Sequence, residues 1–173
     1  MKKILIFSLF FICLNASAQI QRTFLGNTFG DTIAQVISKM RNNGYGDRKI
    51  SDELLYTNVS FGGVNGWNVH FRFNNGKFYC VEFIKNDNSK YTLLTDISKK
   101  IASKYPQYVI ENYQDYYGND FLVFDGGCKF SDGNVTCFMF ADKVQIYGSG
   151  WEYMSHIKYQ VGNSGRYSST DDL

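Results

Sequence analysis

The sequence contains little proline and few histidines or tryptophans. Its 173 residues include one Pro, two His and two Trp, so a proline-rich linker is excluded. The 16 Gly follow no three-residue period, which excludes collagen. Aromatic residues are in excess, with 15 Phe and 13 Tyr. Because so much aromatic surface must be buried or bound, the sequence predicts a folded domain rich in β structure.

The sequence patterns of common catalytic and metal sites are also missing. His70 and His156 stand alone, outside any His-x-His or His-Glu-x-x-His pattern. No Cys-x-x-Cys is present, and no Gly-rich stretch enters a helix in the pattern that binds phosphates. We therefore expect no metal ion, no cofactor and no enzymatic activity.

The first 18 residues have the pattern of an export signal. Two Lys precede an apolar run of about eleven residues, and Ala16-Ser17-Ala18 offers the small residues that a signal peptidase accepts. The run is shorter than the roughly 20 residues that cross a bilayer as a helix. Bulky residues precede Cys13, whereas a lipidation site requires small ones. We expect cleavage after Ala18 and a periplasmic or secreted protein without a membrane span.

Cleavage of this segment would balance the charges of the chain. Residues 1–18 hold two of the 18 Lys and Arg and none of the 16 Asp and Glu, so the net charge falls from +2 to zero. Nucleic-acid binding requires a basic surplus, and a polybasic membrane patch requires clustered Lys or Arg. We expect neither kind of partner.

Two segments of the chain match each other in the order of their residue types. Residues 71–83 and 128–140 each contain an aromatic stretch, a Gly-containing turn and a second aromatic stretch. Asn75-Gly76 and Asp132-Gly133 are hairpin turn signals, because Gly readily adopts the positive φ that tight turns require. A match of this kind indicates a duplicated unit.

A helix is predicted before each hairpin. The first has apolar residues at helical spacing, at Ile33, Val36, Ile37 and Met40. The second has them at Leu94, Ile97 and Ile101. Asp31 or Thr28 is the expected N-cap of the first helix, and Gly44 its expected end. The second helix should stop before Pro106.

A strand is predicted after each helix, at residues 54–61 and 108–113, and a last hairpin spans residues 144–161. The predicted fold class is therefore α+β, with two tandem helix-plus-antiparallel-sheet repeats and the helices packed on one face of the sheet. The predicted divisions are a signal peptide at 1–18, repeats at 19–88 and 89–161, and a flexible tail at 162–173.

Two motifs carry a resemblance to known families: the helix entry Phe24-Leu25-Gly26-Asn27-Thr28-Phe29-Gly30-Asp31-Thr32, and the hairpin from Phe73 to Lys77. With these motifs the chain resembles the β-lactamase-inhibitor-protein-like fold, and one half is similar to the SmpA/OmlA envelope lipoproteins. The resemblance implies a non-catalytic protein that works by protein contacts. We therefore expect an exported protein-interaction module of the bacterial cell envelope, which binds or inhibits another protein through an aromatic sheet face.

Two helices cannot cover all the aromatic residues, so some are expected on the open face or rim of the sheet. Tyr and Trp tolerate partial exposure and are enriched at protein interfaces. The candidate partner-binding residues are Tyr105, Tyr108, Tyr113, Tyr116, Tyr117, Trp151 and Tyr153. The alternative is that these side chains pack within the domain and point their hydroxyls to water.

Three cysteines remain after cleavage, Cys80, Cys128 and Cys137. A two-residue turn at Asp132-Gly133 would place Cys128 opposite Cys137, where a structural disulfide fits. A three-residue turn would put the two residues one position out of step. Of the two, we favour the disulfide.

Two other functions remain as alternatives. With Asn74-Asn75-Gly76 as the loop of the first hairpin, His70 lies opposite Cys80, and a thiol–imidazole pair there would indicate an envelope enzyme. The simpler interpretation of that pair is packing, because no third orienting group or oxyanion donor is apparent. A glycan-binding module, with sugar rings stacked on Trp67 or Trp151, is the other alternative.

Overall fold

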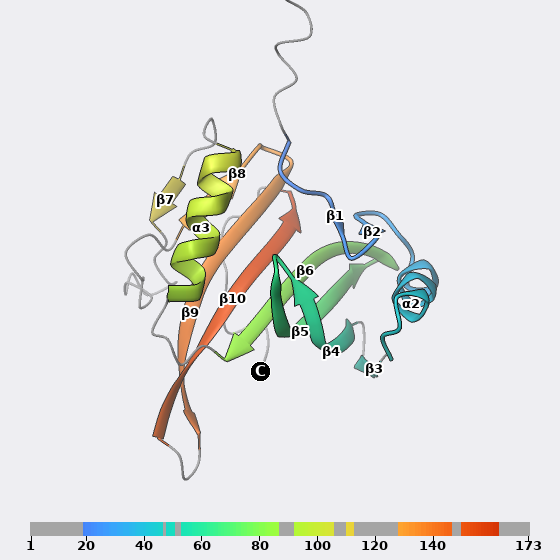
Figure 1. Cartoon of the computed structure of the whole chain (residues 1–173). Coiled ribbons are helices and arrows are strands. Elements are labelled where there is room, and N and C mark those ends of the chain that lie inside the picture. The colour runs from blue at the N-terminus through green and yellow to red at the C-terminus, as the bar shows by residue number, and fades with distance from the viewer. Residues whose placement is uncertain are drawn as a thin grey trace, which may run out of the picture.

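The computed structural model describes residues 19–46, 48–50, 53–86, 92–105, 110–112, 128–146 and 150–162. Figure 1 shows the arrangement of its strands and helices. The first half contains β1 (Thr23–Phe24), β2 (Asn27–Thr28), α2 (Ile33–Asn42), β3 (Arg48–Ile50), β4 (Glu53–Phe61), β5 (Val64–Asn74) and β6 (Lys77–Asn86). The second half contains α3 (Thr92–Lys104), β7 (Ile110–Asn112), β8 (Cys128–Ser131), β9 (Val135–Ile146) and β10 (Gly150–Val161).

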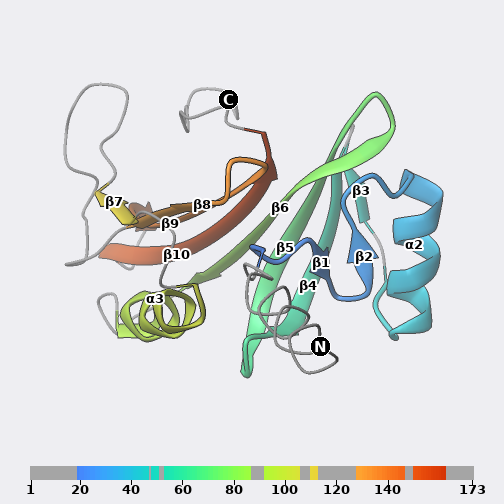
Figure 2. The same ribbon diagram turned by 90° about the horizontal axis from the view of Figure 1, so that it is seen from above.

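Eight strands form one antiparallel sheet in the order β3-β4-β5-β6-β10-β9-β8-β7. The central pair is β6 with β10, which runs from Asn86 opposite Met154 to Cys80 opposite Gln160. Figure 2 shows that the sheet bends near this pair, so that its two ends point in different directions. β1 and β2 form a separate two-stranded sheet.

The predicted fold class of two tandem α+β repeats is wrong. The part of the chain that the structure describes is mostly strand, with ten strands and two helices. The physical reason is that β10 pairs with β6 along one edge and with β9 along the other, so backbone hydrogen bonds join the two halves in one sheet. The helices do not cover a sheet each: α3 lies against β9 and β10, whereas α2 lies beside β2 (Figure 2).

Both predicted helices are confirmed, and both bury one face. Val36 and Met40 of α2 are buried, as are Leu94 and Ile97 of α3. The predicted N-cap of α2 is wrong, because the cap is Thr32. Its hydroxyl accepts a hydrogen bond from the Gln35 N–H, and its own N–H donates to the Gln35 side chain, which is a capping box.

One aromatic core runs through both halves of the sheet. The ring of Phe83 on β6 stacks on Phe61 of β4, with 3.8 Å between centroids. Phe24 of β1 lies 6.2 Å from Phe83 and 4.6 Å from Tyr159 of β10. Much of the aromatic excess is therefore buried in the core of the described residues. The largest fully buried side chains include Trp67, Tyr56, Phe24, Phe71, Phe78, Phe83 and Phe130.

One sheet and one core predict one cooperative unfolding transition. In a Trp151→Phe variant, fluorescence reports the buried Trp67 in the first half, while far-UV circular dichroism reports the whole sheet. Both signals should give the same urea midpoint, because the halves cannot separate without breaking the β6–β10 pair. Two distinct midpoints would contradict the single-sheet account.

Candidate functional site

A row of ionisable side chains crosses the large sheet on the face opposite the core. From β4 to β10 it contains Glu53, His70, Arg72, Glu82, His156 and Lys158, which we call the polar row. The register places Glu82 directly opposite His70 on one side and Lys158 on the other. The neighbouring residues Val81 and Phe83 point to the core, because side chains alternate along a strand.

Glu82 is the centre of the polar row. Its side chain is 1% exposed, and its two oxygens accept from different strands. Oε1 lies 2.9 Å from Nδ1 of His156, and Oε2 lies 3.2 Å from an Arg72 guanidinium nitrogen. The Arg72 Nε in turn lies 2.8 Å from Glu53, which also contacts His70 at 3.1 Å. The carboxylate of Glu82 therefore connects β5 to β10 through β6.

Burial alone would raise the pKa of Glu82, but its partners reverse the effect. The hydrogen bond and charge of His156, followed by the charges of Arg72 and Lys158, lower the pKa below its usual value. The carboxylate is therefore ionised at neutral pH and accepts the His156 N–H. The His156 ring is held in place on its other side by Phe140, stacked at 4.5 Å. A carboxylate with a lowered pKa suits an ion pair rather than a general acid.

The predicted pairing of His70 with Cys80 is wrong. The first hairpin closes with a two-residue turn, Asn75-Gly76, in which both φ angles are positive. The register then shifts by one residue between Phe73 and Arg72, on the side of the hairpin away from the turn. His70 consequently faces Glu82, and Cys80 faces Arg72. Burial raises the pKa of the Cys80 thiol to about 12. The thiol therefore stays protonated at neutral pH and supplies no nucleophile.

The second hairpin also has a register that differs from the prediction. Ser131 lies opposite Thr136, which leaves four residues in the loop, and Cys128 lies opposite Met139 rather than opposite Cys137. The geometric argument for a Cys128–Cys137 disulfide is therefore lost. Cys137 is buried, and the side chain of Cys128 lies outside the described part of the chain. The cause of the longer loop is Asp132, whose carboxylate accepts backbone N–H groups within it.

The structure separates the predicted partner-binding aromatics. Tyr105 is only 5% exposed, and the Lys104 ammonium lies 5.1 Å from its ring centre, so little of this ring is available to a partner. Tyr153 of β10 is half-buried. Trp151 has a described backbone in β10 but no described side chain. The remaining candidates, Tyr108, Tyr113, Tyr116 and Tyr117, lie outside the described residues.

Trp151 and Tyr153 belong to a two-stranded extension of the sheet. β6 pairs with β10 only from Met154 onward, and β8 pairs with β9 only as far as Met139. Residues 143–146 and 150–153 continue as a β9–β10 ribbon, which we call the arm and which Figure 1 shows extending beyond the other strands. At its base the Asn86 side chain donates a hydrogen bond to Glu152. Positions 151 and 153 of the arm are two residues apart on one strand, and strand alternation assigns such positions to the same face.

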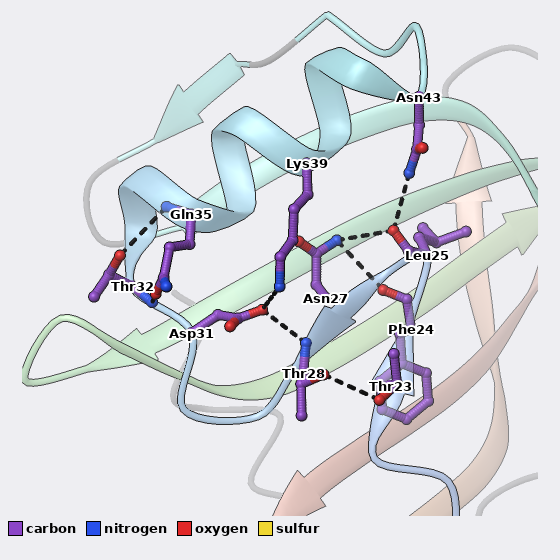
Figure 3. A network of polar contacts seen from close by, with 10 residues as sticks. All are labelled: Thr23, Phe24, Leu25, Asn27, Thr28, Asp31, Thr32, Gln35, Lys39 and Asn43. Carbon is purple, nitrogen blue, oxygen red and sulfur yellow. Dashed lines mark hydrogen bonds and ion pairs between the residues drawn. The ribbon is translucent and has the colours of Figure 1, made fainter.

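The motif at the entry to α2 forms a second polar network, drawn in Figure 3. The turn between β1 and β2 has positive φ at Leu25 and Gly26, and the Leu25 carbonyl accepts from the side chains of Asn27 and Asn43. Asp31 accepts from the Thr28 N–H at 2.8 Å and pairs with Lys39 at 2.6 Å (Figure 3). These contacts fix the small sheet against α2.

Asp31 is held ionised by this network. Burial alone would raise its pKa, but the Lys39 hydrogen bond and the Thr28 N–H lower the pKa below its usual value. The motif therefore has a structural role, and its side chains are turned toward one another and toward backbone groups (Figure 3).

Comparison of the chain with protein-family models, with curated proteins and with solved structures found no match. Among the described residues, no helix is long and apolar enough to cross a membrane. In the same part of the chain, no three His, Cys, Asp or Glu side chains are grouped as metal ligands. Among the described residues, the polar row and the arm are the two features that bear on function.

We expect Glu82→Gln to destabilise the protein by about 3–5 kcal/mol at neutral pH, because it removes the buried negative charge that Arg72, His156 and Lys158 surround. The urea midpoint, read by circular dichroism, measures this loss. The exposed Asp96 on α3 provides the control, and Asp96→Asn should leave the midpoint unchanged.

Wild type and Glu82→Gln should differ less in their free energy of unfolding at acidic pH. The pKa of Glu82 is lowered in the folded state, so its stabilisation is present above the ordinary value of 4.5 and is lost as the pH falls through the folded-state pKa. The difference in unfolding free energy between wild type and Glu82→Gln should shrink below about pH 4.5. A difference that stays constant to pH 3 would contradict the assignment.

Proposed function

We propose that the protein is an exported, non-catalytic module of the bacterial cell envelope that binds another protein, and that the arm carries the contact. The support for this proposal is that a Trp and a Tyr occupy the alternate positions 151 and 153 in a ribbon whose backbone extends beyond the sheet. Tyr and Trp dominate the binding energy of protein interfaces. A two-stranded ribbon has little core of its own, so a binding role accounts for large aromatic residues there.

The register of the arm supports a protein interface in detail. In the backbone register Lys143 lies opposite Tyr153 and Gln145 lies opposite Trp151, so each aromatic position has a polar residue as its cross-strand partner. Aromatic residues surrounded by polar groups are the usual composition of a protein-binding surface. The hydrogen bond from Asn86 to Glu152 holds the base of the arm, which lowers the entropy lost on binding.

The alternatives have less support from the geometry. An enzyme built on Cys80 would need an accessible thiolate, whereas this thiol is buried and has a raised pKa. Stacking of a sugar on Trp67 would need an exposed ring, and Trp67 is fully buried. Sugar binding through Trp151 remains an outcome that the experiment below distinguishes.

The test compares three forms of the mature chain as bait in envelope and culture fractions of the native host. The bait forms are wild type, the double variant Trp151→Ala/Tyr153→Ala, and Ile50→Ala. Ile50 is an exposed apolar residue, 44% accessible, on β3 at the far edge of the sheet, which makes it a matched control. Circular dichroism should show the same fold for all three forms.

Wild type and Ile50→Ala should capture the same protein. The double variant should bind it at least about 30-fold more weakly, because loss of a hot spot costs 2 kcal/mol or more. Equal capture by all three forms would contradict the role of the arm. Capture that survives protease treatment of the fraction but is abolished by periodate would identify a glycan instead.

A further inference from the structure

The chain segment that follows the predicted cleavage site is built into the core. We call residues 20–24 the strap. Ile20 is 2% exposed and belongs to the core cluster, and its backbone N–H donates to Oδ2 of Asp132 at 3.0 Å. The Arg22 guanidinium lies 3.4 Å from the same oxygen. Phe24 ends the strap between the rings of Phe83 and Tyr159.

Asp132 is a rigid receptor for the strap. Its other oxygen, Oδ1, accepts the N–H groups of Asn134 at 2.9 Å and Val135 at 2.7 Å, so the β8–β9 loop fixes the carboxylate. Its side chain is 5% exposed. Burial would raise the pKa of Asp132, but the N–H groups of Val135, Asn134 and Ile20 and the charge of Arg22 lower it. The carboxylate is therefore ionised at neutral pH when the strap is docked on it.

The predicted scissile bond joins Ala18 to Gln19, immediately before the docked residue Ile20. A protease needs the residues on both sides of the bond in an extended, accessible form. Ile20 cannot meet that requirement while its side chain lies in the core and its N–H is bonded to Asp132. Docking of the strap and cleavage of the signal therefore exclude each other.

We propose that the strap couples processing to folding: the signal is removed while the strap is undocked, and docking of Ile20 and Arg22 on Asp132 then completes the core. A folded chain that still carries its signal would be cut only through the fraction of molecules whose strap is open. In that regime the cleavage rate follows the open population. A substitution that weakens docking should therefore accelerate cleavage of the folded full-length chain.

The experiment uses the full 173-residue chain, folded in detergent micelles, with purified signal peptidase. Intact-mass spectrometry measures the initial rate of cleavage between residues 18 and 19. Asp132→Asn keeps the size of the side chain but cannot accept hydrogen bonds at both positions, and Asp96→Asn is the matched control. Loss of a hydrogen bond to a charged group should raise the rate by about tenfold or more in Asp132→Asn. Asp96→Asn should be cut at the wild-type rate.

Hydrogen exchange of the mature chain gives a second measurement that does not depend on the peptidase. The Ile20 amide should be protected in wild type and in Asp96→Asn, and should exchange faster in Asp132→Asn. Equal cleavage rates for wild type and Asp132→Asn would overturn the proposal. So would an Ile20 amide that exchanges as in an unfolded chain, or a natural N-terminus that begins after Ile20.

Discussion

The pairing of β6 with β10 is the constraint on which the rest of the structure depends. It joins two groups of strands that are each continuous along the chain, and it places Glu82 opposite Lys158 in the middle of the sheet. A buried carboxylate such as Glu82, bonded to His156 of β10, adds little net stability, but loss of its partner is costly. It therefore favours this register over one shifted by a residue, which would move a carboxylate into the aromatic core.

The two faces of the sheet have different roles because of this arrangement. On one face, Phe83 and Tyr159 meet Phe24, so the small N-terminal sheet closes the core over the central pair. On the other face, the polar row connects four strands through Glu53 and Glu82. β10 contributes to both faces, and its first residues, 150–153, extend beyond β6 as one strand of the arm. The firmly held centre thus supports the segment to which we assign binding.

Local patterns in the sequence predicted the elements better than their assembly. The helical spacing of Val36 and Met40 and the turn signal Asn75-Gly76 report short-range physics, and both predictions are confirmed. The pairing of β6 with β10 was not predicted, because it depends on contacts about 75 residues apart that no local pattern encodes. The two-residue turn and the bulge between Arg72 and Phe73 each moved the register by one residue, which changed the partner of His70 from Cys80 to Glu82.

The polar row was missed for a related reason. Alternating polar residues on a strand, such as His70, Arg72 and Glu82, ordinarily indicate a solvent-facing side. The burial of Glu82 becomes visible only when the strands are placed side by side. The aromatic residues of the arm could be selected from sequence as candidates, because Trp and Tyr tolerate partial exposure and are enriched at protein interfaces, but their cross-strand partners follow from the register of β9 and β10.

The central claim is that the arm is where this protein meets a partner, and crosslinking in the native host tests it most directly. A photoreactive phenylalanine analogue would replace Gln145, which lies opposite Trp151 on the arm, in one strain and Ile50 in another, so that Trp151 and Tyr153 are kept. The account predicts that irradiation joins the protein to one discrete partner from position 145 and to none from position 50. A partner joined only from position 50, or no adduct from position 145, would contradict it.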